Sequence, residues 1–260
     1  MLTTDRTQPV ETYTAPRPAH NKLLAALSSE DYVRLAPSLK PVLLRSKDSL
    51  HKQGERLTRV YFPSAGSLSL IKQMSDGEVA EITTIGREGM VGAHVFFGEV
   101  ESVSDITVQV EGEASAMAVD AFTAEMNRRG YFYNLIIRYC AALSNHVMQI
   151  GVCNSLHSAE QRACRWLLLT HDRVGRDEFP LTHDFMAAML GVRRPTVTLI
   201  VTSLQRAGLI ACRRGVITIV DRQGLEVTAC ECYAAVNASF GRLLPELGGA
   251  TSAFGIDRSA

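Results

Sequence analysis

The hydrophobic periodicity of the chain changes once, close to residue 120, and this change limits the possible folds. From about Val42 to Asp120, short runs in which apolar and polar residues alternate are separated by glycines, as in β-strands. From Phe122 onward, apolar residues recur at helical spacing. The sequence therefore predicts an α+β fold that begins with an antiparallel sheet and continues with helices.

The predicted strands include three alternating runs, SLSLI (67–71), EVAEITTIG (78–86) and ITVQVEGEASAMAV (106–119). Asp76-Gly77 lies between the first two and predicts a hairpin turn. Together these features predict a small, tightly turned antiparallel barrel or roll, preceded by two short helical turns between residues 23 and 39. The acidic and basic residues are unevenly distributed here, because 75–125 contain eleven acidic residues and one basic residue, Arg87.

Composition excludes several classes of protein. The 260 residues are 46% hydrophobic, which is enough for one large or two ordinary cores. No run is apolar enough to span a membrane, and the first twenty residues lack the apolar region of a secretory signal, so we expect a cytoplasmic protein without a membrane partner. We expect residues 1–19 and 241–260 to be tails.

A long helix is predicted over about 122–154. Its apolar residues repeat at alternating steps of three and four, which is the heptad spacing of a dimer interface. The alternative is a core helix that packs on the roll of its own subunit. The residues assigned to the dimer seam are Phe132, Ile136, Tyr139, Leu143, His146 and Ile150, with Cys153 following. His146 is interpreted as a polar residue that sets the register.

Residues 179–220 carry the densest local pattern. Thr182 can cap a helix that Gly191 ends, and Arg194-Pro195 can open a second helix. Two short helices joined by a glycine turn predict a helix-turn-helix. The runs GLIACRR and GVITIV then predict a β-hairpin, or wing, around Arg214-Gly215.

Charge supports a nucleic-acid interface at this motif, because 191–220 contain five arginines and no acidic residue. The side chains assigned to phosphate and base contacts are Thr182, His183, Arg193, Arg194, Thr196, Thr198, Thr202, Arg213 and Arg214. The partner they indicate is double-stranded DNA.

The motifs VYFPSAGSLSL, GREGMVG, HSAEQRACRWLLLTHDRVG and THDFMAAMLGVRRPTVT resemble the Crp/Fnr family of bacterial transcription regulators over about residues 22–233. The resemblance implies a cyclic-nucleotide-binding-like roll with the dimer helix in 20–154, and a winged helix-turn-helix in 155–240. It also implies a homodimer on an inverted repeat, with RNA polymerase as a candidate partner. Where the family places a glutamate and a second arginine in the recognition helix, this chain has Pro195 and Leu199, so its target sequence should differ.

The same resemblance argues against cyclic AMP as the effector. The family's ribose-binding and phosphate-binding pairs align with Gly92-Ala93 and Ser104-Asp105, and the N-terminal cysteines of iron–sulfur members are absent. The effector is left open between another nucleotide, an apolar molecule such as a fatty acid, and none, and no cofactor is predicted. The candidate pocket residues are Arg87, Glu88, Gly89, Met90, Gly92, Ser104, Asp105, Val147 and Met148.

The six cysteines are interpreted as small buried hydrophobes, and no metal site is predicted. Cys230 and Cys232 are expected on one helix, where residues two apart point to different faces. No P-loop, HExxH, GxGxxG or nucleophile elbow is present, so an enzyme is not expected. The remaining alternative is a ligand-binding or partner-binding signalling module without DNA binding, which a salt-dependent gel shift would separate from a DNA-binding regulator.

Overall fold

The computed structural model describes residues 20–75, 77 and 79–247, so the expected tail at 1–19 lies outside the described residues. Helices α1 (Lys22–Ala25) and α2 (Ser29–Leu35) come first, with the 3₁₀ turn η1 (Ala36–Ser38), as the sequence predicts. The sheet that follows consists of β1 (Lys40–Leu44), β2 (Ser49–His51), β3 (Arg59–Gln73), β4 (Val79–Ile85) and β5 (Asp105–Ala118), and the 3₁₀ turn η2 (Ala93–Phe97) precedes β5.

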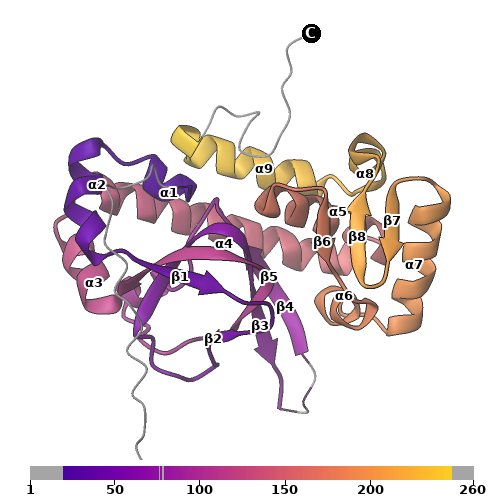
Figure 1. Ribbon diagram of the computed structural model, residues 1–260, viewed down its shortest axis with the longest axis horizontal. Coiled ribbons are helices and arrows are strands. Elements are labelled where there is room, and N and C mark those ends of the chain that lie inside the picture. The colour runs from indigo at the N-terminus through magenta and orange to yellow at the C-terminus, as the bar shows by residue number, and fades with distance from the viewer. Residues whose placement is uncertain (1–19, 76, 78, 248–260) are drawn as a thin grey trace, which may run out of the picture.

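All strands of this sheet pair antiparallel in the order β1-β5-β3-β4, and β2 also pairs with β5. The long strands β3 and β5 shift register between Pro63 and Leu68, where the two backbones come very close. A Cβ atom at Gly112 would lie 2.2 Å from the carbonyl oxygen of Ala65, so only glycine fits there. These bulges bend both strands and close the sheet into the predicted roll (Figure 1). Asp76 of the predicted hairpin lies outside the described residues.

The predicted single helix over 122–154 is wrong in one respect, because it is two helices. They are α3 (Val119–Asn127) and α4 (Tyr131–Leu156), separated at Arg129, whose φ is 56°. The predicted helix ends at about residue 154, whereas α4 continues to Leu156.

Helix α4 lies between the roll and the C-terminal helix α9 (Cys232–Leu243), as Figure 1 shows. Tyr139 donates a hydrogen bond of 2.8 Å to the Met90 carbonyl of the roll, and its ring also contacts Phe240 of α9. The assignment of the whole predicted seam to a dimer interface is therefore wrong. Its members Phe132, Ile136, Tyr139 and His146 are at most 1% exposed within a single chain, and Leu143 and Ile150 are only partly exposed. This face of α4 fits the alternative prediction, a core helix that packs on the roll of its own subunit.

The C-terminal part contains α5 (Ala159–Val174), β6 (Glu178–Pro180), α6 (His183–Leu190), α7 (Arg194–Arg206), β7 (Ile210–Arg213), β8 (Val216–Ile219), α8 (Arg222–Thr228) and α9. The predicted tail from residue 241 starts too early. Helix α9 continues to Leu243, and the turn η3 (Pro245–Leu247) buries Leu244 and Leu247. Residues 248–260 lie outside the described residues.

Candidate functional site

Helices α6 and α7 form the predicted helix-turn-helix. The Thr182 hydroxyl accepts a hydrogen bond of 3.2 Å from the Phe185 N–H and caps α6, and Gly191 ends this helix in the left-handed region. Helix α7 then starts at Arg194 with Pro195 in its first turn. The two helices are bent by 106°, within the range of about 90–120° that is typical of helix-turn-helix motifs.

Helix α7 has one buried face and one exposed face. Val197, Ile200, Val201 and Leu204 are buried, as the sequence predicts. The opposite face exposes Arg193, Arg194 and Thr198, whereas Thr196 and Thr202 are half-buried. The hydroxyls of Thr198 and Thr202 donate to carbonyls of their own helix, which leaves their oxygens as acceptors.

Two residues on this surface are not among the sequence assignments. Asp184 lies 3.3 Å from the Arg194 guanidinium, and both side chains are mostly exposed. Leu199 is 72% exposed on α7, where an apolar side chain can contact a thymine methyl group. Leu199 was not assigned to base contact from the sequence, because polar residues are the usual candidates for such contacts. The assigned His183 approaches the Thr198 hydroxyl at 3.1 Å and so joins α6 to α7.

The predicted wing is present as the hairpin β7–β8. Arg214 and Gly215 form its two-residue turn with φ values of 51° and 77°, and positive φ at both positions matches the twist of a tight hairpin. Arg213 and Arg214 are exposed at this turn. Strand β6, which was not predicted from the sequence, pairs with β8 and completes a three-stranded sheet.

A second candidate site is a hollow of about 350 Å³ between the roll and α4. Four of the predicted pocket residues, Met90, Gly92, Val147 and Met148, line it. The rest of its lining consists of Leu70, Ile85, Val91, Ala93, His94, Phe97, Cys140, Leu143 and Ser144. The lining is mostly apolar and includes no lysine or arginine among the described residues.

The other five predicted pocket residues do not line this hollow. Arg87 donates a hydrogen bond to the Asp172 carbonyl of α5, and Glu88 forms a buried ion pair with Arg173 of α5. Asp105 accepts a hydrogen bond from the Gln53 N–H. Gly89 lies against the ring of Tyr139, where an added Cβ atom would come within 2.5 Å of the phenolic oxygen, and Ser104 is buried with its carbonyl bonded to Ser102. Contacts with α5, with Tyr139 and within the loops decide where these five residues lie. The resemblance in sequence does not give those contacts.

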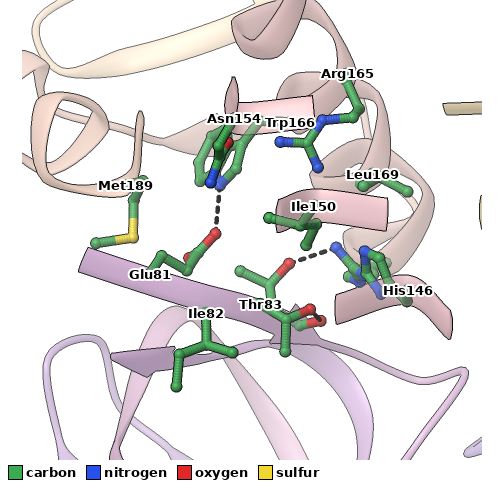
Figure 2. A pocket seen from close by; sticks show the side chains of 12 residues that line it. Glu81, Ile82, Thr83, His146, Ile150, Asn154, Arg165, Trp166, Leu169 and Met189 are labelled. Carbon is green, nitrogen blue, oxygen red and sulfur yellow. Dashed lines mark hydrogen bonds between the residues drawn. The ribbon is translucent and has the colours of Figure 1, made fainter. Parts of the chain in front are cut away.

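Polar side chains also meet where β4 contacts α4 and α5, and Figure 2 shows this contact. Trp166 donates a hydrogen bond of 2.8 Å to Glu81, and burial raises the pKa of Glu81 to about 7. Burial also lowers the pKa of His146 well below its usual value, and neither ring nitrogen has a hydrogen-bond partner. His146 is therefore a neutral core residue, and the prediction that it sets a dimer register is wrong. Only about 10 Å³ remains between these side chains, too little for a ligand larger than water.

Within the part of the chain that the structure describes, no single helix is long and apolar enough to cross a membrane. Only α6 and α7 taken together, as a sharply bent pair, reach that length and composition.

Two family models match parts of the chain. Residues 41–129 match the family model of the cyclic nucleotide-binding domain, and 161–228 match the Crp-like helix-turn-helix domain. A search of curated proteins returned no match.

Solved structures of the same fold come from several bacteria. A Crp/Fnr-family protein of Eubacterium rectale has a TM-score of 0.61 at 18% identity, over 80% of this chain and 98% of that one. FixK2 of Bradyrhizobium japonicum has a TM-score of 0.63 at 14% identity, over 74% and 98% of the two chains. The c-di-GMP-responsive regulator CLP of Xanthomonas campestris has a TM-score of 0.57 at 14% identity, over 74% and 99%. With a cyclic nucleotide-binding domain followed by a Crp-like helix-turn-helix domain, this chain belongs to the Crp/Fnr family of transcription regulators.

Proposed function

We propose that the protein is a homodimeric, sequence-specific DNA-binding regulator that places α7 in the major groove of an inverted repeat. The observation that carries this proposal is the exposed face of α7 and the wing, where arginines and threonines lie on a segment without acidic residues. Contact with RNA polymerase and a cytoplasmic location belong to the same proposal.

The test is selection of binding sites from genomic fragments, followed by fluorescence anisotropy at several salt concentrations. A regulator of this kind should select an inverted repeat and bind it more weakly as salt increases. Selection of no sequence, with no salt-dependent binding to any fragment, would favour a signalling module without DNA binding.

Arg194→Ala is expected to weaken binding to the selected site by about 1–3 kcal/mol per half-site and to relax preference at one base pair. Arg194 is exposed at the start of α7, and its guanidinium can exchange Asp184 for a guanine edge. Arg213→Ala and Arg214→Ala are the matched controls, because these wing arginines should weaken specific and random DNA equally and flatten the salt dependence. An equal loss on both DNAs for Arg194→Ala would assign it to phosphate contact instead.

For dimerisation we propose the exposed face of α4 instead of the seam predicted from the sequence. Met148, Val152 and Leu156 are 59%, 51% and 75% exposed and follow one another at four-residue steps. Parallel packing of two such faces would place the two α7 helices at half-sites about one helical turn, or about 34 Å, apart.

We also propose that the hollow between the roll and α4 receives a small apolar effector. Cyclic AMP is expected not to bind, because a phosphate monoanion needs a cation and the nearby Arg87 points to α5. Isothermal titration with cyclic AMP and cyclic GMP should give no heat of binding, whereas a micromolar dissociation constant for either would contradict this expectation. Mass spectrometry of small molecules released from the purified protein tests the proposed apolar effector directly.

A further inference from the structure

Four potential metal ligands meet where the end of α4 contacts the start of α9. Cys153 lies in the last turn of α4, and His157 is its C-terminal cap. Cys230 lies in the connection from α8 to α9, and Cys232 is the first residue of α9. One ligand atom from each side chain lies within 4.8 Å of all the others. We propose that these residues bind one zinc ion in a tetrahedral site of three thiolates and one imidazole.

The distances fit a single ion. The Sγ atoms of Cys153 and Cys230 are 3.4 Å apart, and Cys232 Sγ lies 3.6 Å from Nδ1 of His157. Tetrahedral zinc, with bonds of about 2.3 Å to sulfur and about 2.0 Å to nitrogen, places two sulfurs about 3.8 Å apart and a sulfur and a nitrogen about 3.5 Å apart. These two pairs already lie within a few tenths of an ångström of the distances that a bound ion requires, and the other ligand atoms lie within 4.8 Å of one another.

The three thiols are buried apart from the main hydrophobic core. Cys153, Cys230 and Cys232 are 0%, 4% and 1% exposed, yet they form a small cluster of their own, apart from the main hydrophobic core. A metal ion would give these sulfurs strong ligand bonds in place of weak thiol contacts.

Surrounding groups orient the ligands as in known zinc sites. Nε2 of His157 lies 3.1 Å from the carboxylate of Glu231, and donation of its proton there leaves Nδ1 free to bind the ion. Gln149 donates a hydrogen bond of 3.1 Å to the Cys232 sulfur, which would stabilise a thiolate. Thiolate and imidazole ligands in a closed tetrahedral arrangement favour zinc over the harder cations magnesium and calcium.

The prediction that Cys230 and Cys232 share one helix is wrong, and this error explains why no metal site was expected. Cys230 precedes the helix and Cys232 is the first residue of α9, so their side chains are free to converge. A bound ion would fix His157, and with it the short connection between α4 and α5, against α9. Zinc binding at these four residues requires neither DNA nor an effector.

The test is cobalt titration of the full-length protein, stripped of metal under reducing conditions. We expect one Co²⁺ per chain, with the strong visible absorption of tetrahedral cobalt and a thiolate charge-transfer band in the near ultraviolet, and displacement of Co²⁺ by one Zn²⁺. Reduced, folded protein that gives neither band would overturn the proposal. So would a Cys153–Cys230 disulfide in protein isolated under reducing conditions.

Variants separate the site from a general effect on folding. Cys230→Ser and Cys232→Ser should lose the charge-transfer band, whereas Cys140→Ser and Cys212→Ser, which lie outside the cluster, should keep it. His157→Cys should keep one ion and gain thiolate absorption, and the exposed Glu231→Gln should weaken affinity about tenfold or more. Equal spectra for the cluster variants and the control variants would overturn the proposal.

Discussion

Replacing Met148 and Val152 by glutamate is expected to convert the dimer into a monomer. Both side chains are more than half exposed and lie one turn apart on α4, and Met148 also lines the rim of the hollow beside the roll. In the proposed dimer each would face its own copy, so the double variant would bring four carboxylates together in an apolar interface. Sedimentation equilibrium should then give the mass of one chain.

Loss of the dimer should also weaken DNA binding, because the two half-sites would no longer be bound by linked helices. We expect affinity for the whole inverted repeat to fall about 100-fold or more, with affinity for an isolated half-site unchanged. The matched control is Val33→Glu with Val227→Glu, which adds the same charge at residues 66% and 87% exposed on α2 and α8. A dimer that persists in Met148→Glu/Val152→Glu, or that is lost equally in the control, would contradict this interface.

Helix α4 illustrates what a periodic pattern can and cannot predict. Heptad spacing is present on two of its faces, and periodicity alone does not say which face a neighbouring element covers. The face predicted as the dimer seam packs against the roll and against Phe240 of α9, which could not be placed from the sequence. The second face carries Ile137, Ala141, Ser144, Met148, Val152 and Ser155.

The helix-turn-helix and its wing were predictable because their determinants are local. The Thr182 cap, the helix end at Gly191 and the Arg214-Gly215 turn each depend on a few neighbouring residues. The hollow depends instead on segments far apart in the sequence, such as Met90 and Val147. Sequence spacing gives the approximate position of such residues but not the direction of their side chains. Arg87 is an example, because its side chain turns to α5 and not into the hollow.

The ion pair between Glu88 and Arg173 is the most deeply buried charge contact between the roll and α5. The two residues are 4% and 3% exposed, and Arg173 Nε lies 2.8 Å from the Glu88 carboxylate. The same carboxylate accepts the Gly86 N–H, and Arg173 also donates to the Thr84 hydroxyl. Each charge is therefore paired and hydrogen-bonded, as burial requires.

Glu88→Ala is expected to lower the free energy of unfolding by about 3–5 kcal/mol, because it leaves the Arg173 charge buried without its partner. Urea denaturation followed by circular dichroism measures the loss. The control is Asp184→Ala, which removes the exposed ion pair with Arg194 and should change stability by less than about 1 kcal/mol.

A second variant separates the unpaired charge from lost packing. Glu88→Leu combined with Arg173→Met removes both charges while keeping apolar volume, so it should recover much of the stability that Glu88→Ala loses. A loss for Glu88→Ala no larger than that of Asp184→Ala would contradict the role given to this pair. Glu88 lies two residues before Met90 of the hollow, and Arg173 lies in the last turn of α5. The pair therefore joins the segment beside the hollow to the helix that leads into the helix-turn-helix.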